Sequence, residues 1–236
     1  MNETLIVIFC FNVEKNIKDL YKNIKKLKLN YNRDILFIDD CSTDKTNEII
    51  KLFNIKNIKL LKNKVNRGYG LNYKYSIKYS IRMKYKNLIF LHGDNQYPAS
   101  KVSLIEKKLQ STDLCYGSRK LNLRSMYKKM PKLRFFANIF LTLFINLLFQ
   151  RNYSEYFSGL RGFKVDKLKG INLSSFSNNW VIEQQIHFEF INKKFIISEF
   201  GIPTSYKKNQ ISQIPPIRYV FSVILNALKY SFNKIF

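Results

Sequence analysis

Short apolar runs alternate with helical patterns along most of this chain. Mostly apolar runs of strand length occupy residues 5–11, 34–38, 58–61, 88–91 and 113–116. Between the first two runs, Ile17, Leu20, Ile24 and Leu27 recur every three or four positions, which is the period of an amphipathic helix. Strands that alternate with helices of roughly ten to fifteen residues predict βαβ units. The expected fold class is therefore α/β, with a mainly parallel central sheet flanked by helices.

The most informative stretch is residues 87–98, NLIFLHGDNQYP. Its first half is apolar throughout, as expected for a strand buried on both faces. It ends in a polar cluster around Asp94, and open parallel sheets bind ligands outside the carboxyl ends of their strands. The Asp94 carboxylate and the Gln96 amide offer hard oxygen ligands to Mg²⁺ or Mn²⁺. The other interpretation is a simple turn at Asp94 and Asn95.

A second predicted strand also ends in carboxylates. Residues 34–38 run directly into Asp39 and Asp40. Carboxylates in that position can accept hydrogen bonds from the base or the ribose of a nucleotide. Because both strands deliver acids to the same edge of the sheet, we expect Asp39 and Asp94 to converge on one pocket. A divalent ion and basic residues there would neutralise a departing nucleoside diphosphate.

Composition limits the partners of this chain. The 236 residues suit one globular domain of ordinary to large size, and 41 Lys and Arg against 16 Asp and Glu give a net charge of +25. That excess must attract something anionic. Nucleic acid is not expected, because the lysines are spread along the chain without a stacking motif. The three cysteines lie far apart, which disfavours a zinc site or a disulfide framework.

Beyond residue 120 the pattern changes. Residues 121–132 are basic and without a clear period, so we expect a loop, whereas residues 135–149 form a helix that is apolar nearly all round. Residues 217–236 form a helix with a narrow polar stripe, suited either to core packing or dimerisation or to an in-plane membrane anchor. No apolar run reaches the ~20 residues that span a bilayer. We therefore expect a cytoplasmic protein, peripheral on the cytosolic face of a membrane.

Motifs in unbroken order over roughly residues 5–206 resemble one known family. They are Asn12 with Glu14, residues 39–44 (DDCSTD, similar to DDGSTD), 66–70 (NRGYG, resembling NxGxG), 92–98 (HGDNQYP, resembling DxDxQxP), 117–119, Arg134 with Asn138, 158–161, Glu183 and 199–203. The chain resembles an inverting family 2 glycosyltransferase of GT-A fold, the nucleotide-diphospho-sugar transferase fold. It looks close to the dolichyl-phosphate mannosyltransferase and polyprenyl-phosphate sugar transferase branch. The implied organisation is a transferase domain over residues 1–206 and an amphipathic helix over 207–236.

The resemblance implies a role for each matched residue. The nucleotide-binding residues would be Asn12, Glu14, Asp39, Asp40, Gly68 and Gly70. The metal would be held by Asp94, Gln96 and His92, and His92 stands where many relatives have the first Asp of DxD. The catalytic residues would be Asp94, Arg119, Arg134 and Glu183, with the arginines meeting donor or acceptor phosphates. Each also has a structural interpretation: a turn for the glycines, solvated charges for the arginines, a buried partner of an arginine for Glu183.

The acceptor is inferred from what the chain lacks. A hydroxyl acceptor needs a general base, and the QxxRW element of processive relatives is missing, whereas a phosphate is already an anionic nucleophile. The basic surface and the apolar helices suit a lipid phosphate, so we favour transfer to a polyprenyl phosphate at an anionic membrane surface. A sugar hydroxyl in polysaccharide biosynthesis is the alternative, with Glu183 or Glu155 as base. A homo-oligomer, a nucleic-acid-binding module and a non-catalytic membrane-docking subunit also stay open.

Overall fold

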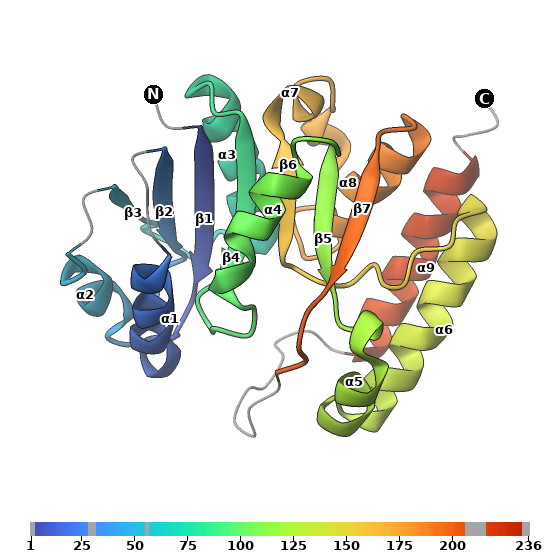
Figure 1. The fold of residues 1–236 in the computed structure, drawn as a ribbon, viewed down its shortest axis with the longest axis horizontal. Coiled ribbons are helices and arrows are strands. Elements are labelled where there is room, and N and C mark those ends of the chain that lie inside the picture. Colours follow the sequence, from blue (N-terminus) through green and yellow to red (C-terminus); the bar gives the residue numbers. More distant parts are fainter. Residues whose placement is uncertain (1–2, 28–31, 55–56, 206–215, 233–236) are drawn as a thin grey trace.

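A seven-stranded sheet forms the centre of the computed structural model, which describes residues 3–27, 32–54, 57–205 and 216–232. Its strands lie in the order β3-β2-β1-β4-β6-β5-β7 (Figure 1). The strands are β1 (Thr4–Cys10), β2 (Arg33–Asp39), β3 (Ile58–Lys62), β4 (Asn87–His92), β5 (Leu114–Ser118), β6 (Arg161–Lys164) and β7 (Ile197–Gly201). All pairs are parallel except those of β6, which runs antiparallel to β4 and β5. The predicted mainly parallel α/β sheet is confirmed.

Helices cover both faces of this sheet. They are α1 (Glu14–Lys26), α2 (Thr46–Lys51), α3 (Tyr69–Arg82), α4 (Val102–Lys108), α5 (Leu123–Lys129), α6 (Lys132–Phe149), α7 (Val165–Leu168), α8 (Ile182–Asn192) and α9 (Pro216–Phe232). In β1, Ile6 and Ile8 pack with α1 and α4 on one face, while Leu5 and Val7 pack with α3 and α8 on the other. This alternation explains the continuous apolar runs, because a strand buried on both faces needs apolar side chains at every position.

Two segments differ from the expectation. The expected loop over residues 121–132 contains the helix α5, whose first turn is capped by the Asn122 side chain accepting from the Ser125 backbone N–H. Met126 and Met130 hold this helix against Phe135 of α6, so local capping and two buried methionines replace the missing helical period. The antiparallel strand β6 was not expected, because four residues that include a glycine carry little strand signal.

The predicted terminal helix is α9, which ends at Phe232 within the described part of the chain. It packs beside α6 and α8 rather than standing apart (Figure 1). The proposed domain boundary between residues 206 and 207 lies outside the described residues.

A buried ion pair joins the end of β5 to the segment after α6. The Arg119 guanidinium donates to the Glu155 carboxylate, with Nε 2.8 Å from Oε1, and Glu155 is fully buried. Glu155 also accepts from the Arg119 backbone N–H at 2.7 Å and from the Asn138 amide of α6 at 3.3 Å. One carboxylate thus fastens three separate pieces of the chain.

We expect Glu155→Gln to destabilise the fold by roughly 3–5 kcal/mol, because it leaves the Arg119 charge buried without a counter-charge. The free energy of unfolding from urea titration measures this. Glu3→Gln, which breaks the exposed ion pair between Glu3 and Lys86, is the matched control and should cost less than about 1 kcal/mol. Equal effects of the two substitutions would show that the buried pair has no special role.

Candidate active site

The acidic ends of two strands flank the end of a third. Strand β1 lies between β2 and β4, and its register pairs Cys10 with Asp39 and Phe9 with His92. Just beyond the strands, the Asp40 N–H donates to the Cys10 carbonyl at 2.9 Å, and the Gly93 N–H donates to the Phe9 carbonyl at 2.8 Å. Asp39 and Asp94 therefore lie at the same edge of the sheet, as predicted.

The two aspartates that follow β2 have different surroundings. The Asp40 carboxylate accepts from the backbone N–H groups of Arg67 and Gly68 and from the Asn63 amide, each at 2.8 Å. The Asp40 carboxylate thus accepts three hydrogen bonds from the segment between β3 and α3. Asp39 is fully buried and accepts from the Ser42 N–H through Oδ1, while its Oδ2 has no partner in the described part of the chain. A buried carboxylate oxygen without a donor has spare accepting capacity.

The negative charge at this edge of the sheet affects the Cys10 thiol. Burial raises the pKa of Cys10 well above its usual value, and the nearby carboxylates of Asp39, Asp94 and Asp44 raise it further. The Cys10 thiol therefore lies near acids from both strand ends. Cys10, Cys41 and Cys115 are all free, in agreement with the sequence-based expectation.

Asn12 and Glu14 fasten the loop after β1 to the loop after β2. The Asn12 side-chain oxygen accepts from the Thr43 N–H at 2.9 Å, and the Glu14 carboxylate accepts from the Lys45 N–H at 3.0 Å. In return, the Glu14 N–H donates to the Asp44 carboxylate at 3.0 Å. These contacts fix the shape of the rim beside Asp39.

The two glycines before and within α3 are explained by contacts inside the protein. Gly68 has φ of +81°, a backbone conformation that residues with a side chain rarely adopt. A Cβ on Gly70 would lie 2.3 Å from the Asn178 carbonyl carbon, and the Gly70 N–H donates to the Asn178 oxygen. A close backbone approach therefore exists at Gly70 within the protein, and its partner is the segment before α8.

His92, Tyr69 and Glu183 form a chain of contacts at the strand edge. The Tyr69 hydroxyl donates to the Glu183 carboxylate at 2.5 Å and lies 3.3 Å from the His92 Nε2. Because the hydroxyl has one proton and donates it in the hydrogen bond to the carboxylate, its oxygen accepts from the Nε2–H of His92. Burial raises the pKa of Tyr69 well above its usual value, and the Glu183 charge raises it further, so the phenol keeps its proton.

The surroundings of His92 and Glu183 decide between their interpretations. The His92 ring packs among Phe9, Tyr69 and Tyr97, and a Cβ on Gly159 would lie 2.5 Å from its Nε2. This favours a hydrogen-bonded, positioned histidine. The Glu183 side chain bonds Tyr69 and makes no ion pair with an arginine of the described residues, whereas its backbone carbonyl accepts from Arg161. Tyr69 carries no sequence signal beyond its place between two glycines.

The residues present fit a divalent ion only in an open site. Asp94 is half-buried and accepts the Gln96 N–H at 3.0 Å in a tight turn. Within the described ranges, no group of three or more His, Cys, Asp and Glu side chains could hold a metal by itself. Mg²⁺ is commonly bound by one or two carboxylates together with substrate phosphates. Asp94 fits that arrangement, with Gln96 in the same turn.

The two predicted phosphate-binding arginines differ. Arg119 is 9% exposed and its guanidinium is engaged with Glu155, so the structure uses it inside the protein rather than at a phosphate. Arg134, in the first turn of α6, is half-buried, and it makes no hydrogen bond or ion pair with any described residue. It lies one helical turn before Asn138, whose amide reaches Glu155.

Comparisons with known proteins agree with this geometry. The family model described as Glycosyl transferase family 2 matches residues 5–171. The uncharacterized protein MJ0544 of Methanocaldococcus jannaschii is 28% identical, over 97% of this chain and 99% of its own length. Glucosyl-3-phosphoglycerate synthase from Mycobacterium tuberculosis, solved with Mn²⁺, uridine diphosphate and phosphoglyceric acid, has a TM-score of 0.74 at 14% identity.

That alignment covers 98% of this chain and 78% of the synthase. A structure of the same synthase with Mg²⁺ and uridine diphosphate has a TM-score of 0.71, also at 14% identity, and covers 98% of this chain and 79% of the synthase. At this identity the likeness shows the fold, which is GT-A. The chain belongs to glycosyl transferase family 2 and is a glycosyltransferase.

Proposed function

We propose that this glycosyltransferase moves a sugar, with inversion, from a UDP- or GDP-linked donor to a polyprenyl phosphate, and that it needs Mg²⁺ or Mn²⁺. The observation on which this rests is the convergence of Asp39 and Asp94 on either side of the end of β1. The Mycobacterium synthase structures with uridine diphosphate and Mn²⁺ or Mg²⁺ support a nucleotide donor and a divalent ion.

Each strand end has its own task at the donor. Asp39, with its unpartnered Oδ2, would accept a hydrogen bond from the base or the ribose. Asp94 and Gln96 would hold a divalent ion against the diphosphate, and the bound ion would neutralise charge on the departing nucleoside diphosphate. Asp40, Asn12 and Glu14 act less directly, because they hold the loops that form the rim.

A phosphate acceptor suits the basic side chains near the site. Such an acceptor is already an anion and attacks without a general base. Arg134 is the arginine to which we assign the acceptor phosphate, since Arg119 is held by Glu155. Exposed apolar side chains on α6 and α9 support a lipid-linked acceptor, and with it a peripheral position on the cytosolic face of a membrane.

A glycan or other hydroxyl acceptor is the second candidate. The observation that favours it is the Glu183 carboxylate, which is 7% exposed and held in place by the Tyr69 hydroxyl. A hydroxyl nucleophile needs a base to take its proton, and a positioned glutamate could serve. The name of the synthase that shares this fold also points to a non-lipid acceptor for that enzyme.

We expect Asp94→Asn to lower sugar transfer by a factor on the order of 10² or more, because the neutral amide no longer holds the divalent ion at the diphosphate. The assay is a panel of UDP- and GDP-sugars with Mn²⁺, scored for product with and without undecaprenyl phosphate. Asp19→Asn, an exposed acid-to-amide change on α1, is the matched control and should leave turnover unchanged. Full activity of the Asp94 variant, with an unaltered melting temperature, would contradict the metal assignment.

Glu183→Gln separates the two acceptor classes. With a phosphate acceptor we expect turnover within about tenfold of the unsubstituted protein, because no proton has to be removed. With a hydroxyl acceptor, loss of the base should lower turnover by roughly 10²–10⁴ and flatten the acidic limb of the pH profile. The measurement is the initial rate with undecaprenyl phosphate and, separately, with free sugar acceptors.

A further inference from the structure

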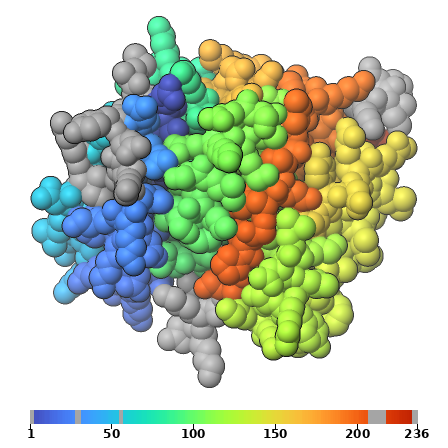
Figure 2. Space-filling view, viewed as in Figure 1, coloured from blue at the N-terminus to red at the C-terminus, as the bar shows by residue number. Residues whose placement is uncertain are grey.

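Exposed apolar side chains gather at one end of this molecule. The described residues include sixteen exposed large hydrophobic side chains, and twelve of them lie on residues 121–147 or on α9. The other four are scattered: Leu52, Val65, Met83 and Ile196. Figure 2 shows α5 and α6, in lime and yellow, forming the outer surface at this end. Such a concentration marks an interaction surface, whereas isolated exposed leucines need no explanation.

Helices α6 and α9 lie side by side (Figure 1). Each of them has two apolar sides. Their inner sides are buried in the core, through residues such as Ile145 of α6 and Val223 of α9. Their outer sides are 58–79% exposed. We call these outer residues the α6–α9 face: Leu133, Phe136, Phe140, Leu143, Leu147, Ile217, Phe221, Leu225 and Phe232.

The inner side of α6 keeps the helix on the protein. By length and composition α6 could cross a membrane. However, the Asn146 amide exchanges two hydrogen bonds with the Tyr153 backbone and accepts from the Tyr156 hydroxyl at 2.7 Å. Phe149 stacks on Phe188 of α8 with ring centroids 4.8 Å apart. Insertion across a bilayer would break these buried contacts, so α6 lies along a surface.

The two segments that carry the face contain charges of one sign. Residues 120–151 and 216–232 contain no Asp or Glu. The same ranges contain nine basic residues: Lys120, Arg124, Lys128, Lys129, Lys132, Arg134, Arg151, Arg218 and Lys229. Exposed aromatic and aliphatic side chains beside cations match the boundary of an anionic bilayer, where apolar groups enter the acyl region and cations meet phosphate.

We propose that the α6–α9 face docks flat on an anionic lipid bilayer. The first turn of α6 lies near the carboxyl ends of the strands, where Asn138 reaches Glu155, so docking would bring headgroup phosphates close to Arg134 and the active site (Figure 1). This inference deepens the proposed function by naming the face of the molecule that meets the membrane. It rests on the proposed function only for the purpose that docking would serve. Binding to a bilayer itself requires neither the sugar donor nor the acceptor.

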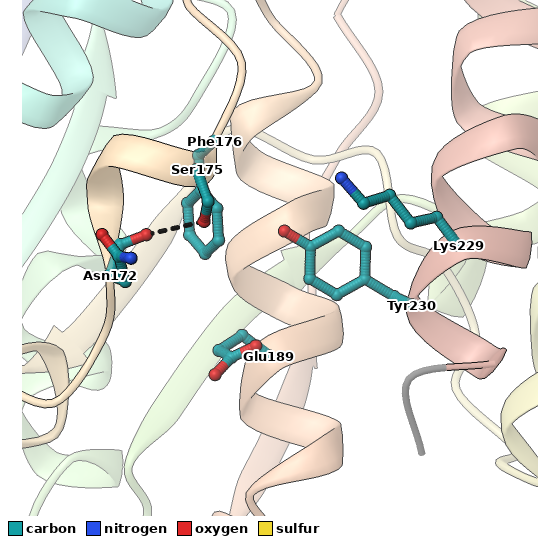
Figure 3. A pocket seen from close by; sticks show the side chains of 6 residues that line it. All are labelled: Asn172, Ser175, Phe176, Glu189, Lys229 and Tyr230. Carbon is teal, nitrogen blue, oxygen red and sulfur yellow. Dashed lines mark hydrogen bonds between the residues drawn. The ribbon is translucent and has the colours of Figure 1, made fainter. Parts of the chain in front are cut away.

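A cavity between α8 and α9 gives weaker evidence of a binding site than the exposed apolar face does. A cavity of about 190 Å³ lies between α8, α9 and the loop before α8, lined by Asn172, Ser175, Phe176, Glu189, Lys229 and Tyr230 (Figure 3). Its polar groups largely bond one another or neighbours, as Ser175 does with the Asn172 carbonyl and Glu189 with Lys193. The lining of this cavity therefore does not indicate a ligand.

Vesicle co-sedimentation of the full chain tests the docking. We expect binding to phosphatidylcholine vesicles that contain phosphatidylglycerol, and much weaker binding to phosphatidylcholine alone. The variant with Phe136→Ser, Phe140→Ser, Phe221→Ser and Leu225→Ser should lose about tenfold or more in partitioning, because it removes apolar area from the membrane interface. The control variant with Leu52→Ser, Val65→Ser and Ile196→Ser removes equally exposed side chains elsewhere and should bind like the unsubstituted protein.

A second set of variants tests the contribution of the basic residues to vesicle binding. Lys128→Gln, Lys129→Gln and Lys132→Gln together should weaken binding to the anionic vesicles and reduce its salt dependence. A charge-matched control with Lys15→Gln, Lys18→Gln and Lys51→Gln changes exposed lysines on α1 and α2 and should have a smaller effect.

Three outcomes would overturn the docking: unchanged binding by the four-residue variant, equal losses in the control variant, or no binding to the anionic vesicles. The third outcome could come with a dimer that the four-residue variant converts to monomer. The dimer outcome, measured by sedimentation velocity, would assign the face to a second copy of the chain. Vesicle binding without transfer to undecaprenyl phosphate would contradict the proposed acceptor alone. Transfer in detergent without vesicle binding would contradict the docking alone.

Discussion

The parallel pairing of β1 with β2 and β4 is the constraint on which the site depends. Register in a sheet is set along the whole strand, so the apolar pairs from Ile6 to Ile8 decide where the polar ends fall. A slip of one residue would turn Asp39 to the opposite face. The backbone bonds from Asp40 to Cys10 and from Gly93 to Phe9 extend this pairing past the strands. Core packing therefore positions the acids, which sit at the end of the most buried part of the sheet.

A buried arginine supports the other wall of the site. Arg161, at the start of β6, is fully buried and donates to the carbonyls of Ser158, Tyr156 and Glu183. It also faces the His187 Nδ1 at 3.2 Å, where burial, and to a lesser extent the arginine charge, lower the pKa of His187 well below its usual value. A neutral imidazole can accept from the guanidinium. The Arg161 guanidinium thus connects the segment before β6, which lies against His92, to the first turn of α8.

The sequence pattern predicted the features that interactions between neighbouring residues in the chain determine. The buried parallel strands and the long helices follow from apolar runs and periodicity, and the acidic strand ends follow from their order in the chain. Apart from α5, whose cap by Asn122 is local, the features that escaped prediction depend on contacts distant in sequence. Strand β6 exists because Gly162 lets α4 approach, since a Cβ there would lie 2.2 Å from an Ile105 methyl carbon. The pairing of Arg119 with Glu155 and the contact of Gly70 with Asn178 likewise require knowledge of what lies opposite in space.

His92 ties these observations together. An aspartate at this position would place a second carboxylate near Glu183, and two acids sharing the Tyr69 hydroxyl would repel each other. The imidazole instead donates to Tyr69, which in turn donates to Glu183, so all three groups are satisfied without a like-charge contact. The consequence is a strand end with one half-buried carboxylate, Asp94, facing the proposed diphosphate. A divalent ion at such a site would depend on donor oxygens for most of its ligands, so ion and nucleotide would bind together rather than in sequence.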